Sequence, residues 1–281
     1  MATKIEHLDG KRLYNAIIIG IKNLVLHQKT LDEINVFPVP DGDTGTNMVF
    51  TLMPIITDIK DSIPDRIDEA MSLIANTALE SARGNSGTII AQFFYGLKRS
   101  TEGLETINLV DFSKALRRGY ISSRDSLANP EDGTIISVMR DVARKGEELI
   151  SEGCDDFSMF IQGIYQEAEI SLKATKTILK ILRKSDVVDS GALGFVLIIQ
   201  GVLNVIEKGQ GRRIQTTHLD ISYEIEKIEG LHKDIDFKID NRFCTECVVR
   251  GDEINRNELK SKIKDFGDSM VIAGSKQRVK I

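Results

Sequence analysis

The chain has 281 residues, with 37 Lys and Arg against 42 Asp and Glu, so its formal net charge is −5. Hydrophobic residues make up 41% and charged residues 28%, a globular composition that excludes wholesale disorder. The slight net acidity argues against a nucleic acid as partner, because such proteins present strongly basic surfaces.

The sequence also argues against a membrane span. The longest apolar runs, such as Ile17–Ile21 and Phe195–Ile199, are far shorter than the roughly 20 residues that a bilayer requires. The first ten residues lack the apolar segment of a secretion signal. Three cysteines are too few for a disulfide-stapled scaffold, so a cytoplasmic protein is expected.

Helical periodicity dominates the chain up to about residue 206. Apolar residues recur every three or four positions between Asp9 and His27, with Asp9 as the predicted N-cap. Gly20 lies inside this predicted helix at a cost of roughly 1 kcal/mol relative to Ala, which indicates a close contact with another helix. Further helices are predicted at 46–59, 65–82, 88–98, 109–127, 134–150, 156–182 and 189–206. About eight helices and no strand before residue 210 predict an all-α bundle or barrel.

The pattern changes near residue 210. Strands are predicted at 237–240, 243–250, 269–273 and 278–281, with one helix at 257–266. We therefore expect two domains, a helical one over residues 1–210 and a small, incomplete α/β unit over 220–281.

The residues that could bind a ligand or take part in catalysis lie where the helical pattern breaks. The four breaks are Pro38–Asn47, Gly84–Gly87, Asp132–Thr134 and Asp189–Gly191. Each combines glycine with small hydroxyl, amide or acidic residues and precedes a predicted helix. A helix start has free N–H groups and a positive dipole end, so it attracts phosphate. Four such starts at one end of a bundle would cradle a polyphosphate.

The first break carries two carboxylates, Asp41 and Asp43, on either side of Gly42. In an extended segment, residues i and i+2 point the same way, and paired carboxylates suit Mg²⁺ shared with substrate phosphates. The alternative is a simple turn in which an aspartate caps the next helix. The surrounding Pro-Val-Pro-Asp-Gly-Asp-Thr-Gly-Thr-Asn string favours the metal site.

This string carries a family resemblance. The segment Asn35–Met48 closely resembles the signature of the dihydroxyacetone-kinase L-type (DhaL-like) nucleotide-binding domain, in the version found in the kinase subunit of bacterial fatty acid kinase. Further matches follow in order at Ser81–Gly87, Glu131–Ile135 and Val187–Ala192. The resemblance covers residues 7 to 208, and Phe243–Glu246 resembles the start of that subunit's middle domain.

The resemblance implies a barrel of eight antiparallel helices that binds ATP with Mg²⁺ at one end. Asp41 and Asp43 would bind the metal. The dihydroxyacetone-kinase branch has a third aspartate just upstream, for which the nearest candidates here are Asn35 and, further back, Asp32. The nucleotide would be contacted by Thr44, Gly45, Thr46, Asn47, Asn85, Ser86, Gly87, Thr134, Ile135, Asp189, Ser190 and Gly191.

Two arginines complete the predicted catalytic set with Asp41 and Asp43. Arg83 would stabilise transition-state charge, or else it pairs with a carboxylate at a helix end. Arg183 lies where the family has a basic residue near the nucleotide, but a cation in a last helical turn also favours the helix dipole. The chain has no Walker-type phosphate loop and no protein-kinase motif set, which disfavours those classes.

Cys244 and Cys247 form a C-x-x-C pair, which fits half a zinc site, a redox pair or neither. In the resembled protein, histidines beyond the position of Ile281 join the cysteine at Cys244. Zinc at Cys244 is therefore expected only if the chain continues past Ile281.

The leading interpretation is an ATP-dependent kinase subunit that phosphorylates the carboxylate of a fatty acid held by a separate fatty-acid-binding partner protein. The sequence gives no sign of an apolar tunnel, which agrees with an acceptor delivered by a partner. One alternative is a dihydroxyacetone-kinase-like L subunit that works with a separate substrate subunit. The other alternative is a nucleotide-binding module without catalysis. Exposed apolar faces on a barrel would allow a homodimer.

Overall fold

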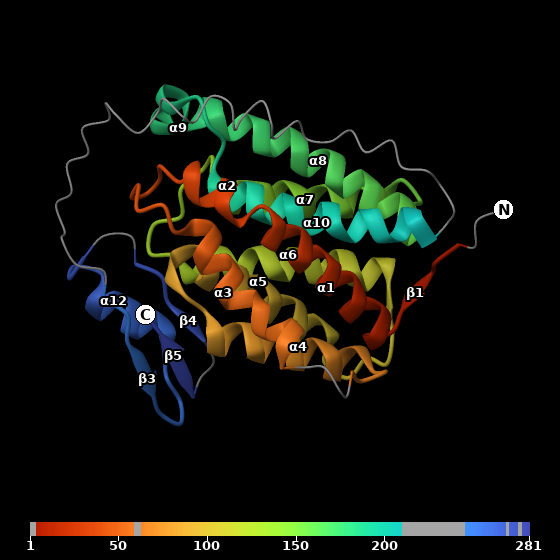
Figure 1. Ribbon diagram of the computed structural model, residues 1–281. Helices are drawn as coiled ribbons and strands as arrows, with labels where there is room; N and C mark the ends of the chain where they lie inside the picture. Colours follow the sequence, from red (N-terminus) through yellow and green to blue (C-terminus); the bar gives the residue numbers. More distant parts are fainter. Residues whose placement is uncertain (1–3, 59–62, 210–244, 268–269, 275–276) are drawn as a thin grey trace.

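Eight long helices run up and down around a shared interior in the computed structural model, which describes residues 4–58, 63–209, 245–267, 270–274 and 277–281 (Figure 1). They are α1 (Gly10–Leu26), α3 (Thr44–Thr57), α4 (Ile67–Ser81), α5 (Gly84–Thr101), α6 (Leu109–Ser126), α7 (Ile135–Ser151), α8 (Phe157–Ile178) and α10 (Ser190–Gly209). The predicted mainly α fold, an eight-helix antiparallel barrel, is confirmed. Within the described residues, no helix combines the length and apolarity needed to cross a membrane.

The alternation of direction places helix starts at two ends of the barrel. Helices α3, α5, α7 and α10 begin at one end, and α1, α4, α6 and α8 begin at the other (Figure 1). Helix α10 packs against both α8 and α1, which closes the ring. The first of these ends also holds two short helices, α2 (Gln28–Glu33) and α9 (Lys180–Ser185).

Glycine allows α1 and α10 to approach closely. A Cβ atom built on Gly20 would lie 2.6 Å from the carbonyl oxygen of Ile198, and one on Gly201 would lie 2.7 Å from the Cα of Gly20. The close contact predicted for Gly20 is therefore confirmed.

Several boundaries differ from the predictions for tertiary reasons. Helix α5 begins at Gly84, four residues early, because that turn packs directly on α3. The predicted helix 156–182 is divided at Leu179, an extended residue against which Gly133 packs. Helix α2 was not predicted. The two-residue strands β1 (His7–Leu8) and β2 (Ile107–Asn108), which pair in antiparallel fashion, are too short to show a strand period and were also missed.

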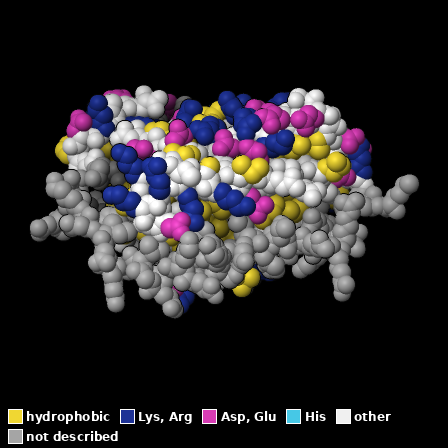
Figure 2. All heavy atoms as spheres, turned by 90° about the horizontal axis from the view of Figure 1, so that it is seen from above, with side chains coloured by type: hydrophobic (Ala, Val, Ile, Leu, Met, Phe, Trp, Pro, Cys, Tyr) yellow, Lys and Arg dark blue, Asp and Glu magenta, His cyan; other side chains and the backbone are white. Residues whose placement is uncertain are grey.

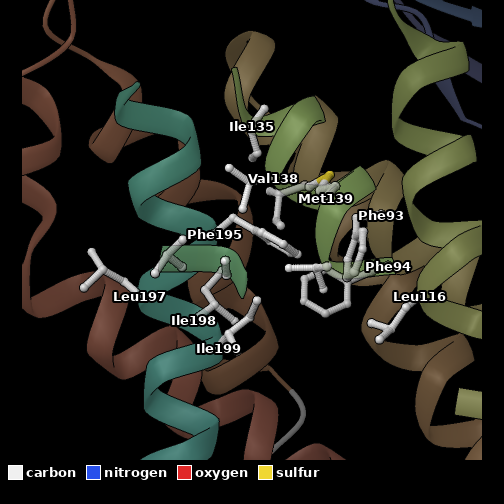
Figure 3. Packing of buried hydrophobic residues seen from close by; sticks show 14 of the residues in the cluster. Phe93, Phe94, Leu116, Ile135, Val138, Met139, Phe195, Leu197, Ile198 and Ile199 are labelled. Atoms are coloured by element: carbon white, nitrogen blue, oxygen red, sulfur yellow. The ribbon is translucent and has the colours of Figure 1, made fainter. Parts of the chain in front are cut away.

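The barrel interior is apolar and partly hollow. Phe93 of α5 and Phe195 of α10 meet edge to face with ring centroids 5.0 Å apart (Figure 3). A cavity of about 950 Å³ extends toward the end where α1, α6 and α8 begin, and Phe94, Phe112 and Phe157 also line it. The expectation that the chain holds no apolar tunnel is thus not confirmed.

The C-terminal residues form a small sheet with one helix. Strands β3 (Val248–Arg250), β5 (Arg278–Lys280) and β4 (Ala273–Gly274) pair antiparallel in that order, and α12 (Arg256–Ile263) follows β3. The predicted α/β character is therefore present. The predicted strand 237–240 and the predicted boundary between 210 and 220 lie outside the described residues.

The described surface mixes charges of both signs. On the face shown in Figure 2, Lys and Arg side chains alternate with Asp and Glu side chains, with small apolar areas between them. Charge on this face is therefore distributed and not concentrated in a patch of one sign.

Candidate functional site

Hydrogen bonds join the helix starts at one end of the barrel in two pairs. The Ser86 hydroxyl at the start of α5 donates to the Thr44 hydroxyl at the start of α3 over 3.4 Å. Asp189 Oδ1, just before α10, accepts the N–H groups of Ile135 in α7 at 3.0 Å and of Ala192 in α10 at 2.8 Å. The structure thus places the four loops that the sequence singled out at the same end of the barrel (Figure 1).

The aspartate pair lies in the loop that leads into α3. Gly42 between the two carboxylates has φ +66°, a left-handed conformation that glycine adopts without strain. Asp43 stands at the N-cap position of α3, yet its side chain accepts no N–H group of that helix. The alternative in which an aspartate of this pair caps the helix is therefore not realised.

Asp32 in α2 takes the capping role instead. Its Oδ1 accepts the N–H of Thr46 at 2.9 Å, and its Oδ2 accepts the Thr46 hydroxyl at 2.7 Å. The Asp32 carboxylate is therefore committed to the first turn of α3. Sequence reasoning named Asp32 only as a distant metal candidate and missed this role, because nothing local links a residue in a short helix to Thr46.

The environment of Asp41 disfavours its charged form. Partial loss of hydration raises the pKa of the Asp41 carboxyl, and the neighbouring Asp43 carboxylate raises it further by repulsion and hydrogen bonding. Asn35 opposes this shift by donating its side-chain N–H to Asp41 Oδ1 over 2.7 Å. Two carboxylates that repel each other are a site that a divalent cation would stabilise.

Asn35 would offer a further oxygen to such a cation. Its side-chain Oδ1 is buried and has no hydrogen-bond partner among the described residues. Two carboxylates and an amide oxygen fit Mg²⁺, which prefers oxygen ligands and usually keeps sites for water and phosphate. The described part of the chain contains no cluster of three or more His, Cys, Asp or Glu side chains suited to a metal.

The start of α5 is pressed against α3. Gly84 has φ +59°, and a Cβ atom on it would lie 2.3 Å from Asn47 Nδ2. A Cβ atom on Gly87 would lie 2.1 Å from the Thr51 hydroxyl oxygen. The glycines of this motif therefore let the backbone of α5 lie directly against the side chains of α3, beside the aspartate loop.

The two predicted arginines differ in their surroundings. The Arg83 guanidinium lies over the Phe50 ring, 5.0 Å from its centroid, next to the start of α5. Arg183 is exposed in the last turn of α9 and makes no ion pair with any residue that the structure describes. The catalytic roles of both arginines stay predictions.

The starts of α7 and α10 share one buried carboxylate. Asp189 is 5% exposed, and burial raises its pKa to about 6, although the N–H groups of Ala192 and Ile135 act in the opposite direction. Thr134 caps α7, and Ser190 donates its hydroxyl to the carbonyl oxygen of Leu31 over 2.6 Å. Hydrogen bonds thus connect the starts of α7 and α10 to each other and to α2.

Of the two C-terminal cysteines, Cys244 lies outside the described residues. Cys247 is exposed and free. The predicted zinc role of Cys244 stays an expectation.

Family models match both parts of the chain. Residues 38–204 match the DAK2 domain, and residues 240–281 match the middle domain of the FakA-like fatty acid kinase family. An uncharacterized protein of Staphylococcus saprophyticus is 32% identical over 282 residues, which cover 99% of this chain and 51% of that protein. Protein YloV of Bacillus subtilis is 32% identical over 288 residues, with the same coverage of 99% and 51%. The chain thus spans about half the length of these curated relatives.

Solved structures share the barrel fold. Dihydroxyacetone kinase from C. freundii in complex with AMP-PNP and Mg²⁺ superposes with a TM-score of 0.53 at 16% identity, over 68% of this chain and 33% of the other. The native form of that kinase gives a TM-score of 0.56 at 16% identity, over 73% and 37% of the two chains. At this level of identity, the similarity shows the fold alone.

Proposed function

Because this chain belongs to the DAK2 domain family, we propose that it binds ATP with Mg²⁺ where α3, α5, α7 and α10 begin, and transfers the γ-phosphoryl group. The two matched family models indicate a kinase-like nucleotide-binding subunit. The observation that supports the proposal is that four helices start at the same end of the barrel, in two hydrogen-bonded pairs, and that Asp43 directly precedes one of these starts.

Asp41 and Asp43 would hold the metal ion, with Asn35 as a third oxygen donor. The raised pKa of Asp41 and the unpartnered Asn35 oxygen support this set. When bound, Mg²⁺ would neutralise charge on the transferred phosphate. Asp32 keeps the first turn of α3 in place beside these ligands, so it acts on the site through Thr46.

The nucleotide would lie against the helix starts. The first turns of α3 (Thr44 to Asn47) and α5 (Asn85 to Gly87) would bind the phosphates, since N–H groups at helix starts favour anions. Thr134 and Ile135, with the segment Asp189 to Gly191, would border the rest of the nucleotide. Arg83 and Arg183 would stabilise the charge that develops during transfer.

For the acceptor, we propose the carboxylate of a fatty acid presented by a separate fatty-acid-binding protein. One carboxylate oxygen would attack the γ-phosphorus while the bond to the ADP oxygen breaks, which yields an acyl phosphate and ADP. The match of residues 240–281 to the FakA-like middle domain supports this acceptor over a small ketose.

Calorimetric titration with AMP-PNP tests the binding site. We expect binding that requires Mg²⁺ in the wild type and falls by about tenfold or more in Asp41→Asn and Asp43→Asn, since each change removes a charged ligand. Asp65→Asn is the control, because Asp65 is exposed and pairs with Lys11 at the opposite end of the barrel. Equal Mg²⁺-dependent binding in all four proteins would refute the site.

The acceptor is tested by supplying ATP, Mg²⁺ and either a fatty-acid-loaded carrier protein or dihydroxyacetone. Acyl phosphate formation only with the carrier supports the proposal. Phosphorylation of dihydroxyacetone would favour the ketose alternative, and no ATP consumption with either acceptor would favour a non-catalytic module.

A further inference from the structure

The small C-terminal unit touches the barrel at the start of α5, one of the loops assigned above to nucleotide phosphate. Glu246 Oε1 accepts the N–H of Gly84 over 2.9 Å. Its other oxygen pairs with Lys280 Nζ at 2.9 Å, and Lys280 donates in turn to the carbonyl oxygen of Ala82. The two side chains therefore hold the backbone on both sides of Arg83.

We propose that Glu246, together with Lys280, is a positioning residue for the loop 82–84 before α5. The two side chains fix the backbone of this loop so that Arg83 and the first turn of α5 face the triphosphate. This inference rests on the proposed ATP site. It gives the small C-terminal unit a direct part in the geometry of that site.

The local backbone explains why this clamp, formed by Glu246 on Gly84 and Lys280 on Ala82, matters. Gly84 has φ +59°, and glycine populates both signs of φ readily, so the peptide before it has little intrinsic preference for one orientation. Glu246 holds this peptide through the Gly84 N–H. The preceding peptide is held by Lys280 at the Ala82 carbonyl and by the Thr51 hydroxyl, which accepts the Arg83 N–H over 3.1 Å. The Arg83 side chain, which leaves the backbone between them, is then directed over Phe50.

The charges at this contact reinforce the geometry. A carboxylate at a helix start interacts favourably with the helix dipole. Partial burial raises the pKa of Glu246, but the hydrogen bonds from Lys280 and from the Gly84 N–H outweigh it, so that the pKa lies below its ordinary value. Glu246 is therefore ionised near neutral pH, and the charge of Arg83 helps to keep it so.

Backbone hydrogen bonds that do not involve Glu246 also hold the small C-terminal unit on the barrel. The N–H of Ile272 donates to the carbonyl oxygen of Ser126 over 2.7 Å, and the N–H of Ala128 donates to that of Met270 over 3.0 Å. Val271 and Ile272 are buried in this contact region. Loss of Glu246 should therefore free the Gly84 N–H at the start of α5 without releasing the whole unit.

Two measurements on the 281-residue chain test the clamp. The first is hydrogen exchange without nucleotide, where Glu246→Ala should accelerate exchange at the Gly84 amide while the Ala128 and Ile272 amides stay protected. The second is calorimetric titration with AMP-PNP and Mg²⁺, where Glu246→Ala should weaken binding by about tenfold, the loss expected for one charged hydrogen bond. Glu246→Gln keeps an acceptor oxygen and should lose less affinity.

Glu258→Gln is the matched control, since Glu258 is an exposed residue of the same small unit and pairs with Lys262 inside α12. It should match the wild type in both measurements. Wild-type exchange and wild-type affinity in Glu246→Ala would overturn the inference, as would simultaneous loss of protection at Ala128 and Ile272, which would make Glu246 a docking residue. If the wild type itself binds no AMP-PNP, the proposed function fails, while the exchange data still report whether the clamp exists.

Discussion

Single carboxylates at one end of the barrel differ in what surrounds them, and this difference separates their roles. Asp32 accepts two hydrogen bonds from Thr46 and so caps the first turn of α3. Asp43 makes no side-chain cap and repels Asp41, which fits the cation site proposed above. Asp189 is buried and links α7 to α10.

Asp189 gives a pH dependence with a definite sign. Its folded pKa of about 6 exceeds the ordinary 3.8, so the folded protein holds this proton more tightly than the unfolded chain does. Ionised Asp189 therefore destabilises the fold, and its cost grows as the pH rises from about 4 to about 6, to at most about 3 kcal/mol.

Asp189→Asn keeps an Oδ1 acceptor for both N–H groups and removes the charge. We expect its free energy of unfolding to exceed that of the wild type at pH 7 and to approach it near pH 4, as measured by urea denaturation across this range. A difference that does not change with pH would show that the buried carboxyl does not titrate as described.

Residues of the site were predictable where the signal is local. Gly42, Gly84 and the hydroxyl residues beside them mark loops that open helices, and the sequence alone places them. Glu246 could not be found in this way, because its partner Gly84 is 162 residues away in the chain. The capping role of Asp32 was missed for the same reason over a shorter separation.

At the scale of single elements, caps and periodicity locate most helices, and tertiary contacts decide the exceptions. Asp9 and Asp156 accept N–H groups at the starts of α1 and α8, close to the predicted boundaries. The early start of α5 at Gly84 depends on the fit to Asn47, and the break at Leu179 coincides with the approach of Gly133. Neither contact leaves a periodic signal in the sequence.

The α1–α10 contact provides a prediction for an element. Gly20→Ala should gain up to about 1 kcal/mol in helix propensity. The new methyl group would meet the Ile198 backbone at 2.6 Å, however, and overpacking of this kind costs roughly 1–3 kcal/mol. We expect a net loss of unfolding free energy in urea titrations.

Gly191→Ala is a suitable comparison, because a Cβ atom on this helical glycine would meet nothing closer than 3.5 Å. It should be neutral or slightly stabilising. Equal stabilisation by both substitutions would mean that α1 and α10 can separate without cost.

For the whole molecule, the gathering of the four loops follows from the up-and-down topology. When successive long helices alternate in direction, every second start lies at the same end, so the breaks before α3, α5, α7 and α10 lie at one end of the barrel (Figure 1). This much was predictable. The apolar cavity and the contacts of the small C-terminal unit with Gly84 and with the segment 126–128 could not be predicted, because they depend on packing between distant segments.

A crystal structure with AMP-PNP and Mn²⁺ would test the central claim most directly, because anomalous scattering locates the metal. We predict one Mn²⁺ peak bound by Asp41 and Asp43, with the triphosphate against the first turns of α3 and α5. A nucleotide that binds elsewhere on the barrel, or a metal peak that touches neither carboxylate, would contradict the account.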